Sequence, residues 1–135
     1  MDRKVLILDD DADTLEMLTV LLDRKMSVST AINIKEAIIA LKRDYIDVVV
    51  CDVNLGTENG FQLIEELESN LVEIPFIIVS GDVDEDKISR AKKMGAMAII
   101  EKPFECEDLI KTIERGLDPI RRIREAKARR IASSA

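Results

Sequence analysis

The sequence predicts an α/β fold in which one open parallel sheet carries helices on both faces. Short runs rich in valine and isoleucine alternate five times with longer segments that have helical spacing. Most of these runs are almost continuously apolar, as expected for parallel strands covered on both faces. The length of 135 residues suits one domain. No apolar stretch approaches the roughly 18–20 residues of a membrane span.

Each element has its own signal. The strands are expected at residues 4–8, 27–31, 47–52, 75–79 and 97–101. Apolar residues three or four positions apart mark the first three helices, namely Leu15, Leu18, Leu22 and Met26, then Ala37, Ile38 and Leu41, then Leu63, Ile64 and Leu67. Asp13 precedes Glu16 by three residues, which predicts a capping-box start for the first helix. Asn33 is expected to cap the second helix, and Gly95 to end the fourth.

Two interpretations remain open for the end of the fifth helix. Either this helix ends near Gly116 and a short basic helix follows, or the spacing of Ile113, Leu117 and Ile120 continues one longer helix through Pro119.

Charge is divided unevenly along the chain. Residues 1–118 carry 14 basic and 26 acidic side chains, a net charge of −12, whereas residues 119–135 carry six basic and one acidic, a net charge of +5. An acidic body is a poor nucleic-acid surface, while the basic segment suits an acidic partner. We therefore expect a domain over residues 1–117 and a basic helix, tail or linker over residues 118–135.

Histidine is absent, and the two cysteines, Cys51 and Cys106, make neither a disulfide framework nor a zinc site. A metal ion here needs oxygen ligands, which points to a hard cation such as Mg²⁺. The N-terminus has no cleavable-signal pattern, so we expect a soluble cytoplasmic protein without a membrane partner.

Polar side chains follow four of the expected strands: Asp9 and Asp10, Asp52, Ser80, and Lys102. Taken singly, the aspartates are also explained as helix caps, Ser80 as part of a turn and Lys102 as a solvated lysine. The carboxyl ends of parallel strands, however, meet at one edge of the sheet, so together these residues indicate a site. Clustered carboxylates repel one another unless a cation such as Mg²⁺ relieves them. Asp52 is then a plausible nucleophile towards phosphorus, and Lys102 and Ser80 would stabilise the charge of the transferred group.

The same residues resemble the signature of a response-regulator receiver domain of two-component signalling, over residues 3 to about 117. The matching positions are Leu8-Asp9-Asp10-Asp11, Asp52, Gly60, Ser80 and Lys102-Pro103-Phe104. Asp52 takes the place of the phospho-acceptor, and the glycine, serine and lysine follow it by eight, 28 and 50 residues, as in the family. The resemblance implies a doubly wound, flavodoxin-like (βα)5 domain with strand order 2-1-3-4-5.

The resemblance also implies the chemistry. Mg²⁺ would be bound by Asp9, Asp10, Asp52 and the backbone carbonyl of Asn54. Asp52 would accept a phosphoryl group from a phosphohistidine on a sensor histidine kinase or phosphotransfer protein, and the absence of histidine here agrees with an external donor.

The resemblance implies roles for two further residues. Lys102 would pair with the acyl phosphate, and Ser80 would hydrogen-bond a phosphoryl oxygen. It also implies that the peptide bond between Lys102 and Pro103 is cis. Phosphorylation would switch a downstream protein or an output domain. A homodimer through the face of the fourth helix, fifth strand and fifth helix stays open.

The chain departs from the family pattern at Ile99 and Gly56. Ile99 stands where the family places its switch aromatic, so coupling is expected to run through Ser80 and the loop after the fourth strand. Gly56 replaces a common proline and predicts a freer loop. Asn54 and Asp82 take the positions that modulate self-dephosphorylation, and they predict a fairly short-lived phosphate.

We interpret the chain as a self-phosphorylating and self-dephosphorylating switch rather than a turnover enzyme. One alternative is the truncated N-terminal module of a larger regulator with a DNA-binding or enzymatic output domain. Another is an Asp-nucleophile phosphohydrolase, but Asn54 stands where such enzymes usually have a second acid. An FMN-binding module is the third, but the phosphate loop is missing and aromatic residues make up only 3%.

Overall fold

The main sheet of the computed structural model has five parallel strands in the order β2-β1-β3-β6-β7. The structure describes residues 3–118 and residue 130. The strands are β1 (Lys4–Leu8), β2 (Ser27–Ala31), β3 (Val48–Asp52), β6 (Phe76–Ser80) and β7 (Ala98–Glu101). Numbered within this sheet alone, their order is 2-1-3-4-5, which confirms the predicted doubly wound fold.

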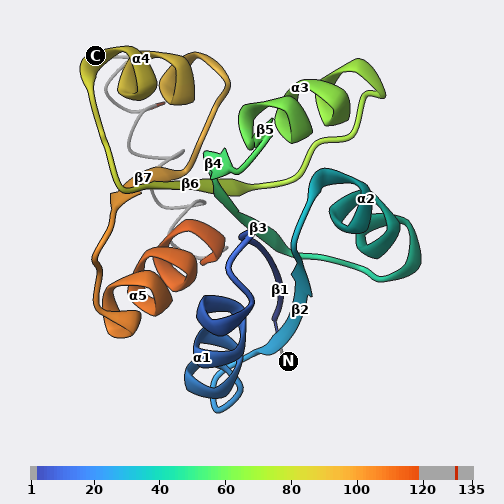
Figure 1. The fold of residues 1–135 in the computed structure, drawn as a ribbon, viewed down its shortest axis with the longest axis vertical. Helices are drawn as coiled ribbons and strands as arrows, with labels where there is room; N and C mark the ends of the chain where they lie inside the picture. The colour runs from blue at the N-terminus through green and yellow to red at the C-terminus, as the bar shows by residue number, and fades with distance from the viewer. Residues whose placement is uncertain (1–2, 119–129, 131–135) are drawn as a thin grey trace.

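Helices cover both faces of this sheet. They are α1 (Ala12–Leu22), α2 (Ile34–Arg43), α3 (Phe61–Ser69), α4 (Glu85–Lys93) and α5 (Cys106–Leu117). Figure 1 shows α1 and α5 on one face and α2, α3 and α4 on the other. Within the described residues, no helix combines the length and the apolar character needed to cross a membrane.

The three central strands, β1, β3 and β6, are almost entirely apolar because helices cover both of their sides. In β1, Leu6 and Leu8 join the core cluster under α2, α3 and α4, while Val5 and Ile7 join the cluster under α1 and α5. Successive side chains of a strand point to opposite faces, so a strand covered twice has no polar position. This explains why the apolar runs of the sequence do not alternate.

The helix α4 is attached to the core differently from the others. Only Ala91 of α4 is buried, whereas each of the other four helices buries two to four apolar residues. Burial contributes about 25 cal/mol per Å² of apolar surface, so α4 gains little from this source. Its polar contacts therefore matter more to its position.

The first helix starts earlier than the sequence predicted. Its cap is Asp11, whose Oδ1 accepts the N–H of Asp13 at 3.0 Å and whose Oδ2 accepts the hydroxyl of Thr14 at 2.9 Å. The predicted capping box from Asp13 to Glu16 is therefore wrong, because both residues already lie inside the helix. An aspartate that accepts helix N–H groups in this way satisfies donors that have no partner within the helix.

Two other predicted helix ends are confirmed. Asn33 caps α2 by accepting the N–H of Glu36 at 2.8 Å. Gly95 follows α4 with a φ of 85°, the left-handed conformation that glycine takes at the end of a helix.

The fifth helix ends at Leu117. The backbone of Asp118 is extended, so a single helix running on through Pro119 is wrong. Residues 119–129 and 131–135, which hold most of the basic segment, lie outside the described residues.

The loop over residues 55–60, expected to be freer because of Gly56, lies largely in a short hairpin of residues 54–59. Strand β4 (Asn54–Leu55) pairs antiparallel with β5 (Glu58–Asn59). Gly56 has a φ of 74°, which suits the first central position of a two-residue turn and excludes proline, whose φ is fixed near about −65°. Oε1 of Glu58 accepts the N–H of Ile34 at 3.2 Å, which ties the hairpin to the start of α2.

Candidate functional site

Three carboxylates meet at the carboxyl ends of β1 and β3. Asp9, Asp10 and Asp52 each offer an oxygen, and these oxygens lie within 4.8 Å of one another. Asp9 and Asp52 are buried, while Asp10 is exposed. Carboxylate oxygens are the ligands of hard cations such as Mg²⁺, so this donor set fits the metal that the sequence predicted. The exposed Asp10 leaves one side of the cluster open to solvent.

A lysine just beyond the end of β7, which β6 separates from β3, enters this cluster. Nζ of Lys102 lies 2.5 Å from Oδ2 of Asp52 and 3.0 Å from Oδ2 of Asp9. Its backbone N–H donates to the carbonyl of Ser80 at 2.9 Å, which fixes the residue just beyond β7. The bond from Lys102 to Pro103 is cis, in agreement with the expectation. The structure therefore brings Asp9, Asp10, Asp52 and Lys102 into one cluster.

The second oxygen of each buried carboxylate is held by a backbone group. Oδ1 of Asp52 accepts the N–H of Asn54 at 3.1 Å, and Oδ1 of Asp9 accepts the N–H of Asp11 at 2.9 Å. Both carboxylates are therefore oriented from two sides. The role of the Asn54 carbonyl as a metal ligand stays a prediction.

Burial and charge oppose each other at Asp52. Burial raises the pKa of Asp52, and the hydrogen bond and charge of Lys102 offset this only in part, so the pKa lies above its usual range. For Lys102, burial works to lower the pKa, but the hydrogen bonds and charges of Asp52 and Asp9 outweigh it and the pKa is raised. The lysine therefore stays protonated, and one positive charge faces three carboxyl groups.

Gly60 allows the chain to pass directly over the backbone of Asp52. A Cβ atom at position 60 would lie 2.1 Å from the carbonyl oxygen of Asp52 and 2.8 Å from Sγ of Cys51. The N–H of Gly60 donates to the carbonyl of Val53 at 2.8 Å, which holds this close approach. Only glycine fits here, a requirement that the eight-residue spacing did not reveal by itself.

Ser80 is buried at the end of β6, and its hydroxyl is engaged in its own turn. The hydroxyl donates to the carbonyl of Asp82 at 3.0 Å and accepts the N–H of Asp82 at 3.2 Å. The side chain of Asp82 is exposed. Ser80 thus lies at the predicted sheet edge, but its hydroxyl donates to this turn in the structure.

Two residues of α4 near this turn were missed by the sequence analysis. Nζ of Lys87 donates to the carbonyl of Asp82 at 2.6 Å, and Arg90 pairs with Glu65 of α3. Within a helix that is mostly charged, neither residue gives a sequence signal. Ile99 lies in β7 opposite Ile78 and packs against the core cluster under α2, α3 and α4.

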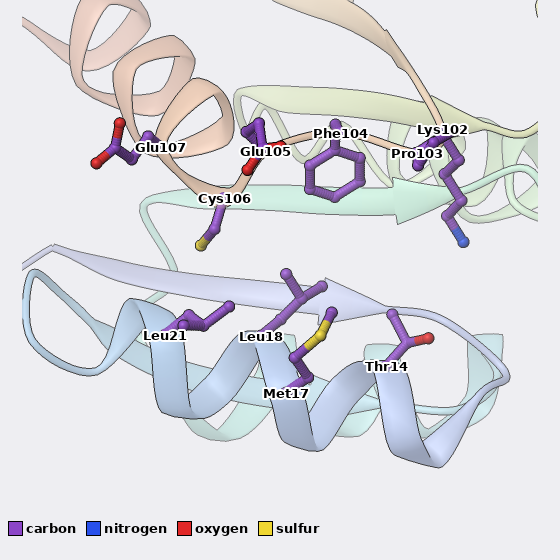
Figure 2. Close-up of a pocket in the computed structure, with 10 residues that line it drawn as sticks. All are labelled: Thr14, Met17, Leu18, Leu21, Lys102, Pro103, Phe104, Glu105, Cys106 and Glu107. Carbon is purple, nitrogen blue, oxygen red and sulfur yellow. The ribbon is translucent and has the colours of Figure 1, made fainter.

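A cavity of about 660 Å³ lies beside the carboxylate cluster, between α1 and the start of α5. Figure 2 shows Met17, Leu18 and Leu21 of α1 on one side and Phe104 and Cys106 on the other. We call this cavity the α1 groove; its remaining lining residues are Thr14, Lys102, Pro103, Glu105 and Glu107. Because Lys102 belongs to both, the groove borders the cluster directly.

Comparison with known proteins agrees with this geometry. A family model described as the response regulator receiver domain matches residues 5–114. The chain therefore belongs to the response regulator receiver domain family. Receiver domains are signalling switches that interact with histidine kinases and output domains, and they bind Mg²⁺ through a cluster of acidic residues.

Curated relatives are longer than this chain. The C4-dicarboxylate transport transcriptional regulatory protein DctD of Pseudomonas aeruginosa is 28% identical over 130 residues, covering 96% of this chain and 28% of that protein. The response regulator SaeR of Staphylococcus aureus is 30% identical over 107 residues, covering 78% of this chain and 46% of that protein. The chain thus spans less than half the length of these relatives.

Solved structures share the fold. The chemotaxis protein CheY4 of Vibrio cholerae is 29% identical with a TM-score of 0.78, covering 87% of this chain and all of that one (100%). NtrX of Brucella abortus is 27% identical with a TM-score of 0.78, covering 100% of this chain and 30% of that one.

Proposed function

We propose that Asp52 is the phospho-acceptor of this receiver. The observation that supports this most is that the buried carboxylate of Asp52 accepts a hydrogen bond from Lys102 and lies beside two further carboxylates, with oxygens within 4.8 Å of one another. An oxygen of Asp52 attacks phosphorus, the P–N bond of a phosphohistidine on the donor protein breaks, and its electron pair returns to the donor's imidazole. The product is an aspartyl phosphate.

The neighbours of Asp52 prepare it for this reaction. The backbone N–H of Asn54 holds Oδ1, and Lys102 holds Oδ2 and supplies positive charge for the arriving group. Ser80 contributes its hydroxyl to a phosphoryl oxygen after it releases the Asp82 carbonyl. Lys102 and Ser80 therefore act on the transferred group, and Asp52 alone changes covalently.

Asp9, Asp10 and Asp52, with the backbone carbonyl of Asn54, would hold Mg²⁺. When bound, this ion supplies positive charge that offsets the repulsion among the carboxylates and the phosphoryl oxygens. Lys102 alone leaves this cluster with excess negative charge.

The donor is a sensor histidine kinase or a histidine phosphotransfer protein, and we propose that it docks in the α1 groove. Met17 and Leu21 of this groove are 54% and 46% exposed, although both are large apolar side chains. Exposed apolar surface beside a reactive group is typical of a protein-binding site. A donor bound here lies next to Lys102, which contacts Asp52.

The chain acts as a switch on itself rather than as a turnover enzyme, and we place it in the cytoplasm. Residues 1–117 form the receiver domain and residues 118–135 the basic helix, tail or linker. The target is a downstream protein or an output domain. The coverage of only 28% of DctD and 46% of SaeR supports the second candidate, a module of a larger regulator. Asn54 and Asp82 are proposed to keep the phosphate fairly short-lived.

Labelling with a small acyl phosphate and Mg²⁺ tests the phospho-acceptor. Mass spectrometry should detect one added phosphoryl group in the wild type and in Asp13→Asn, an exposed aspartate of α1. Asp52→Asn should gain none, and EDTA should prevent the gain in the wild type. Labelling of Asp52→Asn at the wild-type level would overturn the assignment.

Docking has a separate test. Leu21→Lys should slow transfer from a phosphorylated histidine protein that serves the wild type, while labelling by the small acyl phosphate stays unchanged. An equal loss with both donors would contradict docking in the α1 groove.

A further inference from the structure

The helix α4 is connected to the rest of the domain by two cations on one face. Arg90 pairs with Glu65 of α3, and its guanidinium carbon lies 4.5 Å from the centre of the Phe61 ring. Lys87, one turn earlier, reaches back to the carbonyl of Asp82. Residues three apart lie on the same side of a helix. With only Ala91 of α4 fully buried, these two polar contacts add to the attachment of α4.

The carbonyl of Asp82 receives two donors. The hydroxyl of Ser80 approaches it at 3.0 Å and Nζ of Lys87 at 2.6 Å, and Nζ also lies 3.8 Å from Oδ2 of the same residue. A carbonyl has two lone pairs, so it accepts both donors at once. The serine of the site and the first turns of α4 are thus joined through one atom.

We propose that Lys87 is a positioning residue that couples the turn of Ser80 and Asp82 to α4. The proposal rests on the phosphorylation of Asp52 proposed above. When the hydroxyl of Ser80 turns to a phosphoryl oxygen, the Asp82 carbonyl keeps Lys87 as its donor. A hydrogen bond from an ammonium is stronger than one from a hydroxyl, so the contact persists and movement of the turn is passed to α4.

Two features of this chain favour this route. Ile99 gives β7 no aromatic side chain that could change its burial. The helix α4 buries little apolar surface, so its displacement costs little, and elements with few buried contacts are the ones that move in local rearrangements.

The test measures the amide exchange of α4 while beryllofluoride and Mg²⁺ occupy the site of Asp52. The full chain is treated with beryllofluoride and Mg²⁺, and amide exchange of residues 85–93 is measured with and without them. The wild type should show a change in α4. In Lys87→Met, beryllofluoride should still bind, while the change in the amide exchange of α4 should be largely lost.

Two variants control for charge and for folding. Lys93→Met removes the same charge from an exposed position at the end of α4 and should respond as the wild type does. Lys87→Arg keeps a cation in place and should restore the response. The cap of α4 is retained in all of them, because Asp84 accepts the backbone N–H of residue 87 at 2.8 Å.

The outcomes separate the two proposals. A full response of α4 in Lys87→Met would overturn the coupling role. Loss of beryllofluoride binding in Lys87→Met would also overturn it, since Lys87 would then act on the site itself. If the wild type binds no beryllofluoride and matches Asp52→Asn, the phospho-acceptor proposal fails and the coupling proposal fails with it.

Discussion

Lys102 and Asp52, 50 residues apart in the chain, form the shortest contact within the carboxylate cluster, with Nζ 2.5 Å from Oδ2. The same ammonium reaches Asp9 at 3.0 Å. One cation therefore serves two buried acids from neighbouring strands. The position of Lys102 just after β7 makes this possible, because β7 and β3 flank β6 in the sheet.

Removing this cation should slow the reaction at Asp52. For Lys102→Met we expect the rate of labelling by a small acyl phosphate to fall about 10²–10³-fold, the usual effect of losing one stabilising donor at a transition state. Lys111→Met, an exposed lysine of α5, is the matched control and should keep the wild-type rate. A Lys102→Met rate within a few fold of wild type would contradict the role of Lys102.

The raised pKa of Asp52 predicts its pH dependence. Burial is the main cause, so the carboxyl group should take up its proton at a pH above the ordinary value of 3.8. Reactivity needs the carboxylate and should be lost as the pH falls through this raised pKa. The pH dependence of folding stability runs in the opposite direction. The stability that Asp52 contributes is fully present below its pKa in the unfolded chain and is lost as the pH rises through its raised pKa in the folded domain.

A carbon NMR titration of the side-chain carboxyl groups without Mg²⁺ measures this shift. Asp11 is the internal reference, because its hydrogen bond to Thr14 lowers its pKa. Asp52 should therefore titrate at a higher pH than Asp11. The reverse order would show that Lys102 outweighs burial.

Adding a methyl group at position 60 should destabilise the domain. The new Cβ of Gly60→Ala would overlap the Asp52 carbonyl oxygen, and overpacking of this kind typically costs about 1–3 kcal/mol. Gly81→Ala is the control, since a Cβ there meets no atom within 4 Å. Urea unfolding compares the two, and equal stabilities would contradict the close approach at Gly60.

The exposed acid of the cluster should affect metal binding more than folding. Asp10→Asn removes one anionic ligand, so phosphorylation should require more Mg²⁺. Its unfolding free energy without Mg²⁺ should not fall below that of wild type, because the substitution relieves repulsion among the clustered carboxylates. A Mg²⁺ titration of the labelling rate measures the first effect, with Asp13→Asn as control. An unchanged Mg²⁺ requirement would remove Asp10 from the ligand set.

Phosphorylation should leave tyrosine fluorescence unchanged. Tyr45 is the single tyrosine of the chain, tryptophan is absent, and Tyr45 is 84% exposed between α2 and β3. With Ile99 in β7, no aromatic ring is expected to become buried. A clear change in emission on adding beryllofluoride and Mg²⁺ would indicate a rearrangement near Tyr45 instead of at α4.

The main sheet was predictable because four of its five strands are distinct apolar runs bounded by polar or helical sequence, β2 being the exception. The strands β3, β6 and β7 each begin one residue later than predicted, since such a run does not mark where pairing begins. The hairpin of β4 and β5 was missed, because two-residue strands have no measurable period. Asp11 was overlooked as the cap of α1, because Asp13 and Glu16 also fit a capping pattern.

The residues of the site were predictable from spacing, but their contacts were not. Strand ends identify Asp52 and Lys102 as neighbours, since the topology of a parallel sheet fixes where each strand finishes. The engagement of Ser80 with Asp82 depends on the conformation of one turn, and the reach of Lys87 depends on where α4 lies. Neither is encoded in a local pattern.

The hairpin after β3 has a consequence for the direction of the response. The carboxylate of Glu58 accepts the first N–H of α2 at 3.2 Å, and a negative charge is favourable at a helix N-terminus. The loop on this side of Asp52 is therefore anchored to α2, a helix that is well packed in the core. The loop on the other side leads to α4, which has little such anchorage. A structural change at Asp52 is therefore resisted more by the hairpin, which is anchored to α2, than by the loop that leads to α4. We therefore expect the response to phosphorylation to appear at α4 rather than at α2.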